Sequence, residues 1–454
     1  MSNPSFFQSL LRRNEIGANS YLLELDGHRV VLDSGMHPKE EGLDSLPAHG
    51  ELQHNSIDSI FVSHSHLDHS GSLPVLMNDQ PDANVYMTPA TSKLVDALLH
   101  NSVNVMESKR VELGITDYPF YTHRELDRLE KQWRNFDYEK PFQLDNQSRA
   151  TFHDAGHILG SAGVMLETMD KRVFYTGDVQ FENQTLIPGA RLAEEDIDVL
   201  IIETTRGASP RDHGYNRLEE EDRFAESINR CLHQGGSVLI PVFAMGKTQE
   251  VMTMINRFKS EGLIPDAPVY IGGLSTKMTL IFDDFADSTP RNLPGFRILK
   301  DMEIKTGGRR RKRAPIVYQP GCIYALSSGM MTEKTVSNNF ARGFIDNPKN
   351  ALLFVGYADP DSPAGHIRAG ARGDMVDLDP EQPPVQFNCP MEVFDFSGHA
   401  TRDDLLDYIL KVNPAKTILV LGDIEATQWF ADQLAIKLPG CETIIPKPGV
   451  KYTL

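Results

Sequence analysis

The chain of 454 residues carries a net charge of −18, with 40% hydrophobic and 24% charged residues, which is ordinary for a globular protein. This acidic balance argues against a protein that coats nucleic acid nonspecifically, and no apolar run approaches the roughly 20 residues that span a bilayer. The length indicates two or three domains.

The cysteines and the N-terminal residues bear on the cellular compartment. Cys231, Cys322, Cys389 and Cys441 are scattered singly, so they form neither a disulfide framework nor a metal-spaced pair. Residues 1–13 lack the basic-then-apolar pattern and the cleavage site of a signal peptide. We therefore expect a cytoplasmic protein without membrane contact.

The first predicted element is a hairpin with an aspartate at its end. Residues 21–25 and 29–32 read as strands, and Asp26-Gly27 between them is a strong turn signal. Asp33 directly follows the second strand. It is either a turn-capping aspartate or a group that supports a metal site or its water from outside.

The next predicted strand leads into a cluster of four candidate metal ligands. Residues 60–62 are apolar, and His64, His66, Asp68 and His69 follow them. Imidazole and carboxylate together suit zinc or a similar borderline metal. A polar loop with chance histidines is the alternative, but the chain has only 15 histidines.

Further polar groups follow predicted strands along the chain. After a strand at 84–87 and a mostly helical stretch at 91–137, His157 lies among glycines. Strands at 173–176 and 199–202 lead to Asp178 and Glu203. Repeated delivery of polar groups from strand ends is how α/β enzymes assemble a site.

The second half alternates strands with helices, which predicts a second parallel sheet in a separate α/β domain. The strands are expected at 238–243, 269–271, 322–326 and 351–355. Gly246-Lys247 opens a helix, where free backbone N–H groups and the lysine charge could bind an anion. The basic run 305–313 is either a solvated loop or a phosphate-contacting arm. Strands at 393–396 and 417–421 complete the chain, the first of them leading to His399.

In this order, the motifs resemble the metallo-β-lactamase superfamily and, more narrowly, its β-CASP nucleases. The motifs typical of the whole superfamily are Leu32-Asp33-Ser34-Gly35, the run from His64 to His69, Gly156-His157 and Gly177-Asp178. The β-CASP marks are Glu203, His366 and His399, with further similarity at 241–247 and 327–330. One departure is Leu421, where relatives often have a histidine.

The resemblance implies an α/β fold, an αββα metallo-β-lactamase sandwich with an inserted β-CASP domain built on a parallel sheet. The expected bounds are 1–206 and 382–454 for the two parts of the sandwich domain and 207–381 for the insertion.

The resemblance also implies a two-zinc site, although other divalent metals fit the same ligands. One ion would be held by His64, His66 and His157, the other by Asp68, His69 and His399, with Asp178 bridging. Asp33 would orient the nucleophile or a ligand, and His366, positioned by Glu203, would protonate the leaving oxygen. The expected substrate-binding residues are Lys247, Ser327, Ser328, Gly329, Arg309, Arg310 and Arg311.

The expected function is a zinc-dependent ribonuclease that hydrolyses phosphodiester bonds of single-stranded RNA in RNA processing or decay. The alternatives are a DNA-directed β-CASP nuclease, a non-nucleolytic metallo-hydrolase and a scaffold. The resemblance also allows a homodimer, and it leaves endonuclease and exonuclease action both open.

Overall fold

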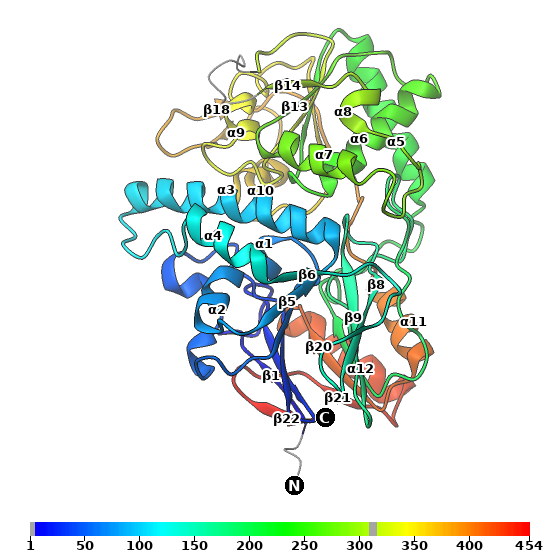
Figure 1. The fold of residues 1–454 in the computed structure, drawn as a ribbon. Helices are drawn as coiled ribbons and strands as arrows, with labels where there is room; N and C mark the ends of the chain where they lie inside the picture. The colour runs from blue at the N-terminus through cyan, green and yellow to red at the C-terminus, as the bar shows by residue number, and fades with distance from the viewer. Residues whose placement is uncertain (1–4, 308–315) are drawn as a thin grey trace. The chain divides into compact units, whose positions relative to one another are not determined.

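The structure is a computed structural model that describes residues 5–307 and 316–454. It divides into two compact units, between which the chain passes more than once (Figure 1). The first unit comprises Met1–Asn183, Gly189–Arg211 and His399–Leu454, and the second comprises Gln184–Pro188 and Asp212–Gly398. The second unit is thus inserted into the first, as the family resemblance implies.

The first unit contains two sheets of seven strands each. The first sheet has the order β22-β1-β2-β3-β4-β5-β6, where the strands are β1 (Phe6–Ser9), β2 (Tyr21–Leu25), β3 (His28–Leu32), β4 (Ser59–Phe61), β5 (Asn84–Met87), β6 (Trp133–Asn135) and β22 (Lys451–Thr453). The predicted hairpin is confirmed: β2 pairs antiparallel with β3, and both Asp26 and Gly27 have positive φ, as tight hairpin turns require.

The second sheet runs β21-β20-β11-β10-β9-β8-β7. Its strands are β7 (Phe142–Gln143), β8 (Arg149–Asp154), β9 (Ala162–Glu167), β10 (Arg172–Tyr175), β11 (Val199–Glu203), β20 (Lys416–Val420) and β21 (Glu442–Ile444). Apolar side chains from both sheets form one shared core, for example Phe7 and Phe61 from the first with Phe152 and Ile201 from the second.

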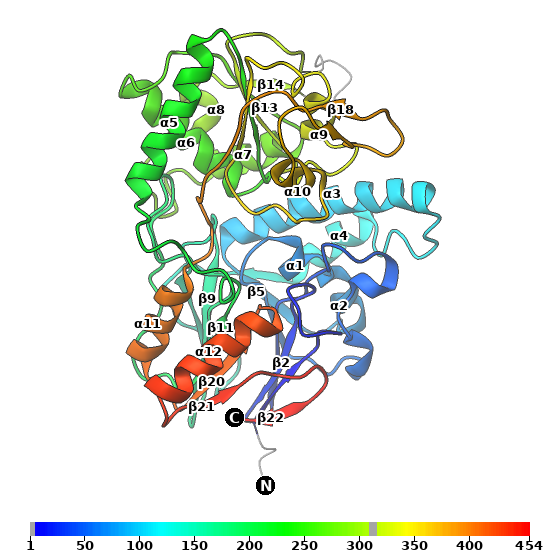
Figure 2. The ribbon, with the colours of Figure 1, turned by 180° about the vertical axis from the view of Figure 1, so that it is seen from behind.

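Helices cover the outer face of each sheet, which completes the αββα sandwich (Figure 2). On the first sheet lie α2 (Leu73–Asp79), α3 (Pro89–Leu113) and α4 (His123–Leu129), and on the second lie α11 (Arg402–Val412) and α12 (Ile424–Lys437). The short helix α1 (Leu67–Ser70) follows β4 and the loop after it. Short 3₁₀ helices are η1 (Gly42–Ser45), η2 (His49–Glu51) and η3 (Glu130–Gln132). Between each sheet and its helices lies a further apolar core. Along each strand, successive side chains point alternately into this outer core and into the core between the two sheets.

The second unit is built on a parallel sheet of the order β14-β13-β15-β12-β16-β19, which confirms the predicted sheet. The strands are β12 (Val238–Pro241), β13 (Val269–Gly272), β14 (Lys305–Gly307), β15 (Ile323–Leu326), β16 (Ala351–Phe354) and β19 (Met391–Val393). The helices are α5 (Arg217–His233), α6 (Lys247–Ser260), α7 (Leu274–Asp284), α8 (Ile298–Asp301), α9 (Val336–Ala341) and α10 (Pro363–Ala369), and β17 (Met375–Val376) pairs with β18 (Val385–Gln386).

The strand predicted at 393–396 begins and ends earlier in the chain. The strand expected at 393–396 is β19, which ends at Val393, and residues 382–398 belong to the second unit because β19 pairs with β16. Phe394 and Phe396 instead pack against Phe224 of α5. Among the described residues, no helix is both long enough and apolar enough to cross a bilayer.

Candidate metal centre

The histidine loop is held in place by backbone contacts to the segments before β2 and after β3. His64 and His66 follow β4, and Asp68 and His69 lie in the short helix α1. The carbonyl oxygen of Asp68 accepts a hydrogen bond from the Asn19 N–H at 2.9 Å. Gly35 lies so close that a Cβ there would approach the Asp68 carbonyl oxygen to 1.8 Å, so a side chain at this position would displace the loop.

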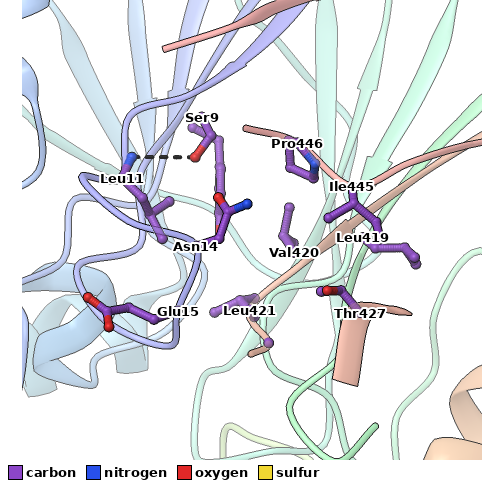
Figure 3. A pocket seen from close by; sticks show the side chains of 12 residues that line it. Ser9, Leu11, Asn14, Glu15, Leu419, Val420, Leu421, Thr427, Ile445 and Pro446 are labelled. Atoms are coloured by element: carbon purple, nitrogen blue, oxygen red, sulfur yellow. Dashed lines mark hydrogen bonds between the residues drawn. The ribbon is translucent and has the colours of Figure 1, made fainter. Parts of the chain in front are cut away.

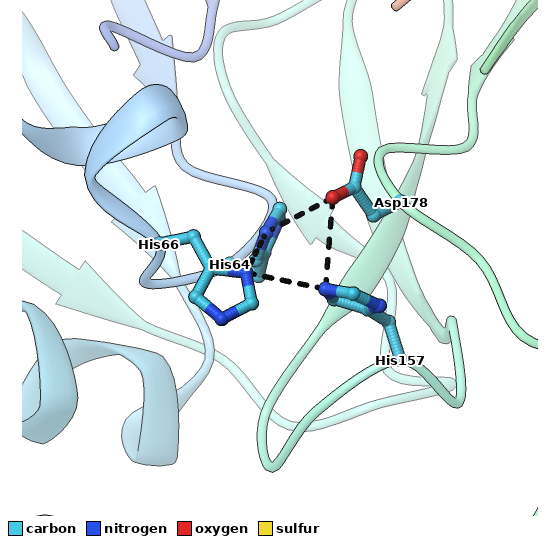
Figure 4. A group of neighbouring side chains, drawn as sticks. All are labelled: His64, His66, His157 and Asp178. Carbon is cyan, nitrogen blue, oxygen red and sulfur yellow. Dashed lines mark hydrogen bonds and ion pairs between the residues drawn. The ribbon is translucent and has the colours of Figure 1, made fainter. Parts of the chain in front are cut away.

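Four of the predicted ligands form one compact group (Figure 4). The Nδ1 atom of His66 lies 3.1 Å from Nε2 of His64 and 3.2 Å from Nε2 of His157. Oδ2 of Asp178, which follows β10, lies 3.4 Å from His64 Nε2 and 3.6 Å from His157 Nε2. These donor atoms therefore converge on one place from three separate segments of the chain.

The remaining predicted ligands also lie close to Asp178. His69 Nε2 lies 3.4 Å from Asp178 Oδ1 and 3.7 Å from Asp68 Oδ2. His399 Nε2 lies 3.9 Å from Asp178 Oδ2, while its Nδ1 lies 3.2 Å from the buried carboxylate of Glu203. The structure thus brings all seven predicted ligands together around Asp178.

Asp33 supports this cluster from outside. It is fully buried, with φ at 59°, and its Oδ2 accepts hydrogen bonds from His69 Nδ1 at 2.8 Å, from the Ser63 hydroxyl at 2.8 Å and from the Tyr175 hydroxyl at 2.6 Å. Its Oδ1 accepts the Ser63 N–H at 2.7 Å. With Nδ1 of His69 donating to Asp33, Nε2 is left to face Asp178.

The cluster concentrates buried charge of both signs. Burial raises the pKa of Asp178 to about 7, against the opposing effect of His69 and His399. Burial alone would lower the pKa of both histidines, but the carboxylates outweigh it: Asp178 leads the rise for His69, to about 10, and Glu203 leads it for His399, to about 9. Protons on the imidazoles thus offset the carboxylates, and a cation would displace these protons.

This donor set fits a divalent metal. Buried imidazoles and carboxylates, with partners that orient them, are what such an ion requires. Oδ1 of Asp178 is buried and accepts no hydrogen bond from the described residues, although His69 lies near it. A cation beside Asp178 would satisfy that oxygen.

The substrate-binding residues expected from the sequence lie in the second unit. Lys247 begins α6 after β12, and its ammonium group donates to the carbonyl oxygen of Phe396. The neighbouring parallel strand β15 is followed by Ser327, Ser328 and Gly329. Lys247 and this segment therefore both lie beyond the carboxyl ends of neighbouring strands. Arg309, Arg310 and Arg311 lie outside the described residues. His366 is exposed on α10.

Several supporting residues were not expected from the sequence. Asn19 places its Nδ2 3.1 Å from His69 Nε2, and Gln180 donates from its side-chain amide to the His399 carbonyl oxygen at 3.1 Å. Ser63 and Tyr175 contact Asp33 as described above. Ser63 adjoins the histidine motif and Tyr175 ends a strand, but neither residue type indicates such a contact without the fold.

A small cavity lies at the end of β1 and β20, lined in part by Asn14, Glu15, Tyr21 and Leu421 (Figure 3). Its volume of about 30 Å³ holds one or two water molecules and excludes a nucleotide. Leu421 is buried there with a φ of 56°. The departure from the family pattern at this residue thus lies in the sandwich core.

Comparison with known families accounts for most of the chain. Residues 13–224 match the family model described as the metallo-beta-lactamase superfamily, and residues 248–367 match the Beta-Casp domain. Residues 384–446 match the Zn-dependent metallo-hydrolase RNA specificity domain.

Curated relatives and solved structures agree with these matches. A probable RNase MJ4 of Methanocaldococcus jannaschii is 30% identical, over 97% of this chain and 98% of its own length. An RNase J-like protein of the same organism is 28% identical, over 96% of each chain. The endoribonuclease YSH1 of Saccharomyces cerevisiae is 26% identical over 92% of this chain, which spans 54% of the yeast protein. A crystal structure of a protein of unknown function from Enterococcus faecalis V583 shares the fold, with a TM-score of 0.57 at 13% identity over 99% of this chain and 100% of that chain.

Proposed function

Because the chain belongs to the metallo-β-lactamase superfamily and to its β-CASP branch, we propose that it is a metal-dependent ribonuclease that hydrolyses phosphodiester bonds of single-stranded RNA. The observation that carries this proposal is the convergence of imidazole and carboxylate groups around Asp178. The relatives named as RNases, which match nearly their full length, support RNA as the substrate.

We assign two Zn²⁺ ions to the cluster. The first would be held by His64, His66 and His157, the second by Asp68, His69 and His399, and Asp178 would be shared between them. Bound divalent ions polarise the phosphate and lower the pKa of the water that attacks it.

Other side chains would orient the metal-binding histidines and supply the proton that the leaving group needs. Asp33 fixes the ring of His69 through Nδ1, and Glu203 fixes the ring of His399 in the same way. His366 would supply a proton to the 3′ oxygen as its bond to phosphorus breaks. The products would be a 5′ phosphate and a 3′ hydroxyl. Lys247 and the segment Ser327 to Gly329 would contact the RNA.

The test is cleavage of a 5′-labelled single-stranded RNA, beside DNA of the same sequence, with Zn²⁺ and with a chelator. We expect RNA fragments that require the metal, with DNA spared. The variant Asp68→Asn should lose cleavage and bound zinc, while Asp44→Asn, which changes an exposed aspartate of η1, should retain both.

Three outcomes would contradict the proposal. Cleavage of DNA in preference to RNA would indicate the DNA-directed alternative. Intact RNA in the presence of bound zinc would indicate a different metallo-hydrolase or a scaffold. Full cleavage by Asp68→Asn, purified free of wild-type protein, would exclude Asp68 from the site.

A further inference from the structure

A second pair of histidines lies on the helices that cover the first sheet. His100 of α3 and His123 of α4 place their Nδ1 atoms 2.7 Å apart, with the two rings nearly parallel. Both helices are well defined by their ends: the Thr88 side chain caps α3, and Thr122 and Glu125 form a capping box on α4. The two helices lie side by side (Figure 1).

Two carboxylates act on the other nitrogen of His100. Its Nε2 lies 3.3 Å from Oδ1 of Asp96, one turn earlier on α3, and 3.7 Å from Oδ1 of Asp127, one turn after His123 on α4. A proton on Nε2 satisfies these carboxylates, so Nδ1 of His100 presents a lone pair toward His123. A carboxylate on the far nitrogen is the usual arrangement for a histidine that binds a metal.

We propose that His100 and His123 form a second metal site, separate from the cluster around Asp178, for a borderline divalent ion such as Zn²⁺. Two imidazole nitrogens favour such an ion over Mg²⁺ or Ca²⁺, which prefer oxygen ligands. Asp96 and Asp127 add negative charge beside it, and water completes the coordination.

Binding of the ion requires both rings to move. Two nitrogens that bind one tetrahedral zinc at about 2.1 Å lie about 3.4 Å apart, so the Nδ1 atoms must separate by about 0.7 Å and the rings must turn until both lone pairs point to the ion. His123 is exposed at the start of α4, where its side chain has room to move. The bound ion would link α3 to α4.

The competing arrangement is a hydrogen bond in which His123 Nδ1–H donates to His100 Nδ1, with no metal. The two arrangements differ in zinc stoichiometry. We would dialyse the full chain to equilibrium against Zn²⁺ and measure bound zinc for wild type and for the double variant His100→Gln/His123→Gln. A matched control is His54→Gln, because His54 is an exposed histidine that also pairs with an aspartate, Asp79.

We expect the double variant to bind one zinc ion fewer than wild type and His54→Gln to bind the same number. Equal zinc content in all three proteins would overturn the proposal. A second measurement uses wild-type protein alone and so does not depend on folding of the variant. Zinc should slow diethylpyrocarbonate modification of His100 and His123, quantified by peptide mass spectrometry, while His54 reacts at an unchanged rate. Equal rates at His100 and His123 with and without zinc would likewise overturn it.

Discussion

The contacts of Asp33 make the variant Asp33→Asn a demanding test of the metal centre. In the wild type the carboxylate accepts four hydrogen bonds, from the Ser63 N–H and hydroxyl, from His69 and from Tyr175. Asparagine tolerates the positive φ at this position but has one acceptor oxygen, and its NH₂ group would face donors. With the amide oxygen at the position of Oδ2, three of the four hydrogen bonds remain, now to an uncharged acceptor, and the NH₂ group meets the Ser63 N–H. The lost hydrogen bond to a charged group costs about 1.5 kcal/mol and the buried N–H left unpaired costs about as much again, so the free energy of unfolding should fall by about 3 kcal/mol.

The same change should also weaken metal binding, because the charged acceptor that orients His69 becomes a neutral amide. Loss of such a partner typically lowers metal affinity about 10- to 100-fold. Unfolding would be measured by urea titration in the presence of a chelator, so that bound metal does not contribute, and zinc affinity by competition with a chromophoric chelator.

The variant Tyr175→Phe separates stability from metal binding. It removes one hydrogen bond to Asp33, which should lower the free energy of unfolding by about 1.5 kcal/mol, but leaves the contact between Asp33 and His69 intact. Zinc affinity should therefore change little. If Asp33→Asn bound zinc like wild type, or if Tyr175→Phe weakened zinc binding as strongly as Asp33→Asn, the assigned role of Asp33 would be wrong.

Two further predictions concern the framework of the first unit. Burial lowers the pKa of His49, which hydrogen-bonds Ser20, to about 4. Between pH 6.5 and pH 4, His49 therefore takes up a proton in the unfolded chain but not in the folded one, so the free energy of unfolding falls as the pH falls. In chelator, urea titrations of wild type should show about 2 kcal/mol more loss between pH 7.5 and 5 than those of His49→Gln; parallel profiles would refute this. Gly35→Ala should lower the free energy of unfolding by about 3 kcal/mol and weaken zinc binding, because the new Cβ would collide with the Asp68 carbonyl. Gly50→Ala should do neither, because a Cβ at Gly50 meets nothing within 4 Å. Equal stability of the two variants would contradict this steric explanation.

The sequence by itself determined the strands before Asp33, His64, Asp178 and Glu203 and the residues that follow them, whereas β6 lies in the stretch 91–137 that was expected to be mostly helical. The hairpin at Asp26-Gly27, the ligands after β4 and the parallel sheet of the second unit are all written in local patterns of apolar residues and turns. The spacing of the motifs also identified the family, because ligands such as those between His64 and His69 lie on one short segment of the chain. Local signals of this kind depend on neighbouring residues only, so they can be read without the fold.

The tertiary structure decided which atoms meet. His66 presents Nδ1 to the cluster, whereas His64 and His157 present Nε2. The carboxylate of Glu203, for which the sequence suggested a role beside another histidine, lies against His399, 196 residues later in the chain. Such contacts depend on how distant strands pack and on the rotamers that this packing allows, and no local pattern encodes them.

The contact between His100 and His123 likewise depends on the tertiary structure. In the sequence, each residue is an ordinary histidine within a helical stretch, and the i,i+4 spacing of Asp96 and His100 is common on exposed helices. The two imidazoles come within hydrogen-bond distance only because α4 packs alongside α3. The sequence thus set the chemical identity of every group in both sites, and the packing of helices and sheets set which groups share a proton or a metal ion.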